Sequence, residues 1–195
     1  ISLPAVEDIL ANDFTVALWF RTTSSGRAAL LSNYAPADRH YTLEVNGDGS
    51  GATVPGAVSF ILNDVTHGPR AVVATRTGLN DDNWHHVAGM RSEGMLHIFV
   101  DGDLVGSLDI GDDYSFLGVQ GPLVGKYGTQ SIYFEGTIDE VAIIRRAMSI
   151  GEIGELASAG YQVSLDSEFE SPVVDGERAS IWREMSWGAG APLGV

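Results

Sequence analysis

Hydrophobic and polar residues alternate along most of the chain with the period of two that a β-strand requires. In the segment FTVALWFR, Phe14, Val16, Leu18 and Phe20 fall on one face. The alternation recurs in YTLEVNG, and further short apolar runs are bounded by Gly, Pro, Asn and Asp, which are typical of turns. The predicted strands occupy residues 13–22, 41–47, 56–64, 70–78, 84–91, 95–102, 104–110 and 131–146.

Two tight turns are predicted to join the strands between residues 84 and 110 into a meander. Residues 92–94 form a short connection that contains a glycine. Asp101 and Gly102 form the next turn, because glycine tolerates the positive φ that a two-residue hairpin loop demands. The sequence therefore predicts antiparallel pairing in this part of the chain.

Two adjacent histidines, His85 and His86, follow Trp84 on one of these strands. Consecutive strand residues face opposite sides of a sheet, so the two imidazoles cannot bind one metal ion without a bulge. We therefore expect one histidine to be packed or hydrogen-bonded beside Trp84 and the other to lie on the opposite face or near an edge. A direct role of the pair in chemistry is the alternative.

One short helix is predicted near residues 149–159. Ser149 is suited to the N-cap, Glu152 completes a capping box, and Gly160 can end the helix. The strand before it is apolar on both faces from Ile138 to Ile144, which is typical of a strand covered on both sides. Many short strands and one terminal helix predict an all-β fold, a two-sheet antiparallel β-sandwich.

The chain is expected to divide into a sandwich domain, residues 1–160, and a C-terminal extension, residues 161–195. The segment YQVSLD could add a strand, but the remainder of the extension has weak periodicity. Trp182, Met185 and Trp187 are too apolar for a tail in water. We expect the extension to complete the sandwich or to contact a neighbouring chain, which would make the protein an oligomer.

Composition narrows the classes of partner. Among 195 residues, 11 Lys and Arg against 26 Asp and Glu give a net charge of −15, which repels nucleic acid and anionic membrane surfaces. We expect no membrane insertion, because no apolar run approaches the roughly 18 residues that a bilayer requires. The absence of cysteine excludes thiol chemistry. The acidic clusters either form a solvated surface or hold a hard cation.

Three stretches in order, FTVALWFRT, NWHHVAGMRSEGMLHIFVDGDLVG and FEGTIDEVAIIRRAMSIGEIGEL, resemble the successive signatures of laminin G-like domains. These domains belong to the concanavalin A-like lectin/glucanase superfamily. The resemblance spans residues 1–160 and implies a jelly-roll sandwich of two curved antiparallel sheets. It also implies recognition of glycans or proteins outside cells or on their surfaces.

The resemblance makes Asp139 a candidate metal ligand, because some members of the family bind a structural Ca²⁺ through this aspartate and a strand that precedes ISLP. The chain begins with ISLP at Ile1, so we expect the extension to replace that strand or the chain to be a piece of a longer protein. The alternative role of Asp139 is a hydrogen bond to backbone at a strand edge.

Catalysis is not expected. Relatives that cleave glycans place their catalytic carboxylates at alternate positions of one strand, whereas Glu135 and Glu140 lie five residues apart and would face opposite sides of a regular strand. The chain also lacks a Gly-x-Ser-x-Gly elbow and a His-Glu-x-x-His motif. The expected protein is therefore not an enzyme.

Glycan binding requires an exposed aromatic face together with planar polar groups, and two predicted loops supply both. Each candidate also has a structural alternative, such as closing the core, pairing with an acid or bracing a turn. Trp19 and Trp84 are expected to pack in the core. The candidate ligand-binding residues are Tyr34, Asp38, Arg39 and His40 in the first loop and Lys126, Tyr127 and Gln130 in the second.

The sequence therefore favours a non-catalytic, lectin-like recognition module, secreted or on the cell surface, whose partner is a carbohydrate. The rival interpretation is a structural or cell-adhesion domain that binds other protein subunits in a surface or particle assembly. The apolar extension and the absent first strand favour this rival, since both invite completion by a neighbouring chain.

Overall fold

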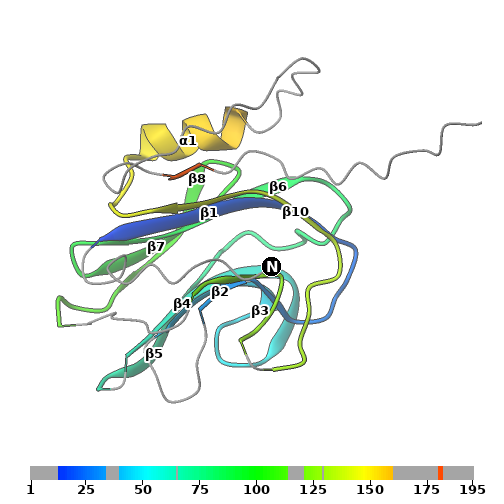
Figure 1. Cartoon of the computed structure of the whole chain (residues 1–195), viewed down its shortest axis with the longest axis horizontal. Coiled ribbons are helices and arrows are strands. Elements are labelled where there is room, and N and C mark those ends of the chain that lie inside the picture. Colours follow the sequence, from blue (N-terminus) through cyan, green and yellow to red (C-terminus); the bar gives the residue numbers. More distant parts are fainter. Residues whose placement is uncertain are drawn as a thin grey trace, which may run out of the picture.

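A computed structural model gives the fold of the chain (Figure 1). It describes residues 13–33, 40–64, 66–113, 121–128, 130–159 and 180–181.

Two antiparallel sheets stack face to face, and the one that contains β2, β3, β4 and β5 is strongly curved (Figure 1). This arrangement confirms the predicted all-β jelly-roll sandwich. The six-stranded sheet has the order β11 (Ser180–Ile181), β10 (Thr137–Ile144), β1 (Phe14–Arg21), β6 (His85–Ser92), β7 (Met95–Val100) and β8 (Asp103–Asp109). The five-stranded sheet has the order β5 (Gly68–Val73), β4 (Thr53–Asp64), β3 (His40–Gly47), β2 (Ala28–Ser32) and β9 (Leu123–Val124).

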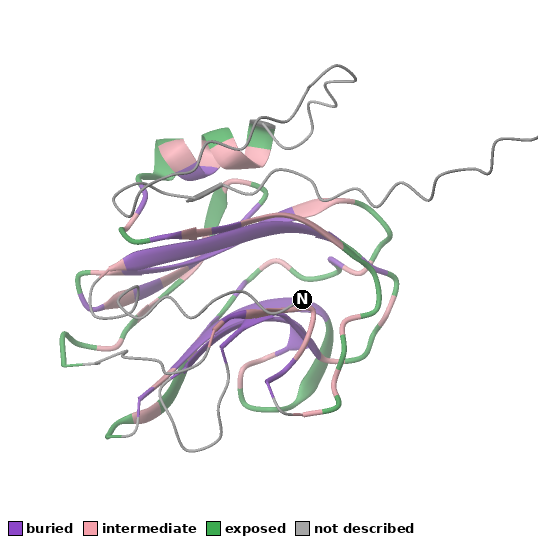
Figure 2. Cartoon of the chain, viewed as in Figure 1, coloured by how far each residue is buried: buried purple, intermediate pink, exposed green. Residues whose placement is uncertain are grey.

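The core lies between the sheets, where the alternating apolar residues meet (Figure 2). The inward residues of β1 that the pattern selected are all fully buried. Gly89 pairs with Val16 in β1 and Ile98 in β7, and a side chain there would collide with Phe60 of the opposite sheet. A Cβ at Gly89 would lie 2.4 Å from the Phe60 ring, so this glycine lets the two layers pack closely.

The outer face of the six-stranded sheet is covered by the helix α1 (Ile150–Ala159) (Figure 1). The predicted capping box is present: the Ser149 hydroxyl accepts a hydrogen bond from the Glu152 amide at 3.3 Å, and the Glu152 carboxylate accepts one from the Ser149 amide at 2.8 Å. Ile153 is fully buried against this face. The helix thus supplies a second, smaller core on the side away from the main one.

The two predicted hairpin turns are confirmed. Glu93 and Gly94 have φ of 47° and 74°, and Asp101 and Gly102 have φ of 52° and 87°, as two-residue turns of type I′ require. Ser92 pairs with Met95, so the first turn is one residue shorter than predicted.

The strand boundaries differ from the sequence prediction in several places, among them β2 and β10. The strand β2 was not predicted, because all five of its residues are buried and show no polar alternation. The strand β10 begins at Thr137 rather than at residue 131, and it bulges at Glu140, whose φ is 49°. Its inner face packs on the main core and its outer face on the helix-side core, as the apolar run predicted.

Part of the C-terminal extension belongs to the first sheet, since Ser180 and Ile181 pair with Ile143 and Ala142 of β10. The boundary at residue 160 and association through residues 161–195 stay predictions. The expected strand in YQVSLD, the residues Trp182, Met185 and Trp187, and the segment before residue 13 lie outside the described residues.

Candidate ligand-binding site

A solvent-accessible cavity of about 380 Å³ lies at one end of the sandwich. Three segments that are distant in sequence line it: residues 21–24 at the end of β1, Asp82 before β6, and residues 135–137 at the start of β10. Hydroxyl, carboxylate and guanidinium groups dominate this lining. Such groups can hydrogen-bond a polar ligand.

Hydrogen bonds between the segments hold the cavity together. The Thr22 hydroxyl donates to the Glu135 carbonyl at 2.6 Å, and the Asp82 amide donates to the Thr22 carbonyl at 3.1 Å. Gly136 permits the close approach, because its φ is 154° and a Cβ there would lie 2.3 Å from the Arg21 carbonyl oxygen. The cavity is therefore a built feature of the fold.

The charged groups of the cavity are Arg21, Asp82 and Glu135. The guanidinium of Arg21 lies 5.5 Å from the centre of the Trp84 ring, and its Nε lies 3.9 Å from an Asp82 oxygen. Trp84 is only partly buried, whereas Trp19 is buried as predicted. The expectation that Trp84 packs in the core is thus only partly met, because its ring supports a cavity residue.

An exposed aromatic side chain, that of Tyr133, lies two residues before Glu135 in the sequence. Tyr133 is 60% exposed, and the ammonium group of Lys126 lies 5.7 Å from the centre of its ring. Phe134 packs against Phe20 of the core, with 6.3 Å between the ring centres. Tyr133 and Glu135, on either side of Phe134 in the sequence, are exposed. Two residues span at most about 7 Å, so the backbone of Tyr133 lies close to that of Glu135 in the cavity lining. We name Tyr133 and Lys126 the aromatic shelf.

The structure separates the predicted residues of the second loop by role. Lys126 belongs to the shelf, but Tyr127 is 7% exposed and lies beneath the Arg27 guanidinium at 5.1 Å. The backbone amide of Gln130 donates a hydrogen bond to the backbone carbonyl of Tyr127 at 2.9 Å, which closes a turn. The burial of Tyr127 agrees with its structural alternative, bracing a turn, and the roles of Lys126, Tyr127 and Gln130 in ligand binding stay predictions.

Of the four candidate residues in the first predicted loop, the structure describes only His40, which begins β3 and is buried. Tyr34, Asp38 and Arg39 lie outside the described residues, so their roles in ligand binding stay predictions. Sequence reasoning did not select Tyr133 or the residues that line the cavity. The alternation in Tyr133, Phe134 and Glu135 was the available signal, because an inward Phe134 leaves both neighbours in solvent.

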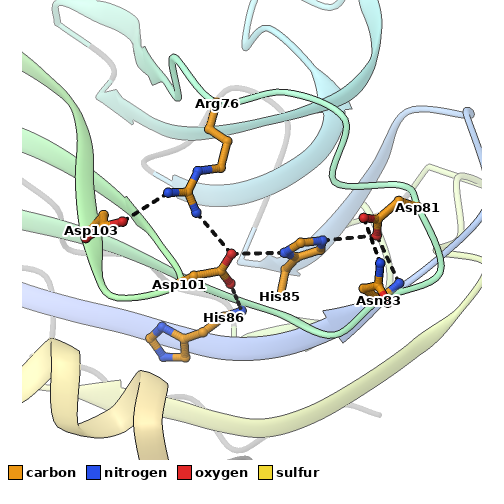
Figure 3. A network of polar contacts seen from close by, with 7 residues as sticks. All are labelled: Arg76, Asp81, Asn83, His85, His86, Asp101 and Asp103. Carbon is orange, nitrogen blue, oxygen red and sulfur yellow. Dashed lines mark hydrogen bonds and ion pairs between the residues drawn. The ribbon is translucent and has the colours of Figure 1, made fainter.

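The two histidines face opposite sides of β6, as predicted, and His85 joins a polar network beside the cavity (Figure 3). Its imidazole lies 3.1 Å from Asp101 through Nδ1 and 3.1 Å from Asp81 through Nε2. Arg76 extends the network by donating to Asp101 at 3.1 Å and to Asp103 at 3.0 Å. These contacts tie the turn before β6 to the β7–β8 hairpin.

The network shifts the pKa values of its members. The hydrogen bond to Asp101, opposed in part by burial and aided by Asp81, raises the pKa of His85 above its usual value. Hydrogen bonds from the side chain and the backbone amide of Asn83, together with the hydrogen bond from the His85 side chain, lower the pKa of Asp81 to about 2. Burial acts to raise the pKa of Asp101, but its bonds to the two histidines and the charge of Arg76 lower it. The two flanking carboxylates thus favour a protonated His85.

His86 points to the opposite side, toward the helix α1 (Figure 3). It is 2% exposed and contacts the ring of Trp19, with 5.5 Å between ring centres, rather than Trp84 as predicted. Burial lowers its pKa to about 4, and its Nδ1 has no hydrogen-bond partner among the described residues. His86 is therefore a neutral core residue on the side of β6 opposite to His85.

Asp139, the candidate calcium ligand, makes a hydrogen bond to the backbone. Its carboxylate accepts a hydrogen bond from the Glu140 amide at 2.8 Å, which is the alternative role that the sequence left open. In the described part of the chain, no group of three or more His, Asp or Glu side chains is arranged to hold a metal ion. Calcium binding stays a prediction.

The geometric reason for excluding glycan cleavage was wrong. Glu135 precedes β10 and lines the cavity, and Glu140 lies in the bulge. The two glutamates therefore do not occupy opposite faces of one regular strand. The absence of catalysis stays a prediction on other grounds.

The fold agrees with comparisons to known proteins. Residues 1–154 match the family model described as the concanavalin A-like lectin/glucanases superfamily, in its laminin G group. No curated protein matches the chain. No helix within the described ranges is long and apolar enough to cross a membrane.

Several solved structures share the fold at low sequence identity. The sialidase module CBM40 of Ruminococcus gnavus, bound to α2,3-sialyllactose, has a TM-score of 0.60 and 21% identity over 76% of this chain and 84% of its own. A putative carbohydrate-binding protein of Bacteroides ovatus has a TM-score of 0.63 and 18% identity over 80% and 43%. Domains LG4-5 of the mouse laminin α1 chain have a TM-score of 0.55 and 20% identity over 76% and 41%.

Proposed function

Because the chain belongs to the laminin G group of the concanavalin A-like lectin/glucanases superfamily, we propose that it is a non-catalytic extracellular module that binds carbohydrate. The observation that carries this proposal is an exposed tyrosine, Tyr133, two residues before Glu135, which lines a polar cavity. Of two structures with the same fold, the R. gnavus module is bound to sialyllactose and the B. ovatus protein is a putative carbohydrate-binding protein. The chemistry of the site supports the same class of ligand.

Each part of the site suits one feature of a sugar. The exposed ring of Tyr133 offers a flat apolar face to the C–H groups of a pyranose, and Lys126 can donate hydrogen bonds to hydroxyl or ring oxygens. The cavity offers the carboxylates of Asp82 and Glu135 and the guanidinium of Arg21, which accept from and donate to hydroxyl groups. An oligosaccharide of a few units would contact the shelf and the cavity together.

The proposal is tested on a glycan array, followed by titration calorimetry with the best ligand. We expect Tyr133→Ala to weaken binding about tenfold, because stacking on an aromatic ring contributes about 1 kcal/mol or more. Ile150→Ala is the matched control, since Ile150 is a similarly exposed apolar residue, 63% exposed, at the start of the helix α1. Equal affinities of the two variants would place the ligand elsewhere.

Lys126 is the only lysine of the chain, which permits a chemical version of the test. Acetylation by an amine-reactive ester modifies Lys126 and the terminal amine alone. We expect it to weaken glycan binding, and we expect bound glycan to protect Lys126 from the reagent. If the reaction rate is unchanged at a saturating glycan concentration, the shelf is not part of the site.

A further inference from the structure

The carboxylates of the cavity outnumber its cations. Asp82 and Glu135 face a single guanidinium, that of Arg21, which already lies against the Trp84 ring and near Asp82. The Glu135 carboxylate accepts only a long hydrogen bond, 3.3 Å, from the Ser24 hydroxyl, and no ion pair to it occurs within the described residues. The lining therefore carries net negative charge and spare acceptor oxygens.

The surroundings do not reverse this balance. Of the nearby cations, His85 and Arg76 are already engaged by the carboxylates of Asp81, Asp101 and Asp103, and the Lys126 ammonium group lies against the Tyr133 ring, outside the residues that line the cavity. The chain as a whole carries a net charge of −15. An anionic group entering the cavity would meet repulsion from both its lining and the rest of the molecule.

We propose that the cavity binds a neutral sugar unit through hydroxyl groups that donate to Asp82 and Glu135, and that it discriminates against a sugar unit bearing a carboxylate. This inference rests on the proposed function and specifies its ligand class. An ionised carboxylate only accepts hydrogen bonds, so the hydroxyl group of a neutral sugar can donate to it. The carboxylate of an acidic sugar has no proton to donate and cannot form this hydrogen bond. The rejection of acidic sugars is a repulsive contribution to specificity.

Neighbouring hydroxyl groups of one ring fit this arrangement, because Arg21 can donate to the oxygens whose protons the carboxylates accept. At about 6 Å in a solvent-exposed cavity, repulsion from each lining carboxylate corresponds to about a threefold loss of affinity. Glu135 and Asp82 are thus the residues that set specificity.

The test uses pairs of oligosaccharides that differ only at the terminal unit, which carries a hydroxymethyl group in one member and a carboxylate in the other. Affinities are measured by calorimetry for the full chain and for Glu135→Gln and Asp82→Asn. We expect the full chain to prefer the neutral member about fivefold or more. Either substitution should weaken binding of the neutral member and reduce the preference to about threefold or less.

Glu155→Gln on the helix α1 is the control for the change in net charge, because Glu155 is exposed and lies away from the cavity lining. It should leave the preference unchanged. Equal or tighter binding of the acidic member, or a preference that survives both cavity substitutions, would overturn the inference while leaving carbohydrate binding intact. If no glycan binds at all, the proposed function itself fails and the inference fails with it.

Discussion

The buried imidazole of His86 is expected to make the protein sensitive to mild acid. Burial holds its pKa at about 4 in the folded chain, whereas a histidine in an unfolded chain titrates at about 6.5. Below pH 6.5 the unfolded chain therefore binds a proton at this site that the folded chain does not. Stability from His86 is present above pH 6.5 and is lost progressively as the pH falls to 4.

The size of the effect follows from the two pKa values. Between pH 7 and pH 5, proton linkage at His86 removes about 2 kcal/mol from the free energy of unfolding, and the loss reaches about 3 kcal/mol at pH 4. His85 acts with the opposite sign, because its pKa is raised in the folded chain. Its contribution is present below pH 6.5 and is lost as the pH rises through its folded pKa.

His86→Phe isolates the contribution of His86, since phenylalanine keeps an aromatic ring beside Trp19 and does not titrate. Urea unfolding at pH 7 and pH 5 gives the free energy of unfolding of both proteins. We expect the variant, relative to the original chain, to gain about 2 kcal/mol on acidification. At pH 7 its stability should change little, because the substitution also removes a buried nitrogen without a partner.

His86→Gln should show the same relative gain in the free energy of unfolding on acidification. This second variant controls for a packing effect of phenylalanine. A parallel pH dependence in the original chain and both variants would refute the assignment. So would an NMR titration that places the pKa of His86 near 6.5.

Two further predictions concern the packing of the fold. Gly89→Ala should cost about 1 to 3 kcal/mol, because its Cβ would overlap the Phe60 ring, and Phe60→Leu in the same chain should recover part of this loss in urea unfolding. Ser149→Ala should cost about 1 kcal/mol by removing the N-cap of α1, whereas Ser149→Asp should not, and equal unfolding midpoints for the two would contradict the capping role.

The fold was largely predictable because its determinants are local. Alternation selected the buried residues of β1, and the glycines at 94 and 102 marked the hairpin turns that the structure confirms. The capping box of Ser149 and Glu152 located the helix to within one residue. The strand β2 was missed because AALLS is buried on both faces, so it offers no period to detect.

The candidate site was less predictable because it depends on contacts between distant segments. Arg21 and Glu135 line the same cavity because β10 pairs beside β1, and the bulge at Glu140 breaks the alternation from which the geometry of Glu135 and Glu140 was argued. Trp84 appeared to be a core residue, yet its partner is an arginine whose position no local pattern reveals. Lys126 was selected as a ligand-binding candidate, which stays a prediction, but its aromatic neighbour, Tyr133, was not selected.

Mapping the bound glycan by NMR tests the central claim most directly. Amide chemical shifts of the full chain would be followed during titration with the best neutral oligosaccharide from the array. The account predicts that the changes cluster in three segments, residues 21–24, 82–84 and 133–137, with the helix α1 unaffected. Changes centred on the helix or on the β7–β8 hairpin, with those three segments unchanged, would contradict it.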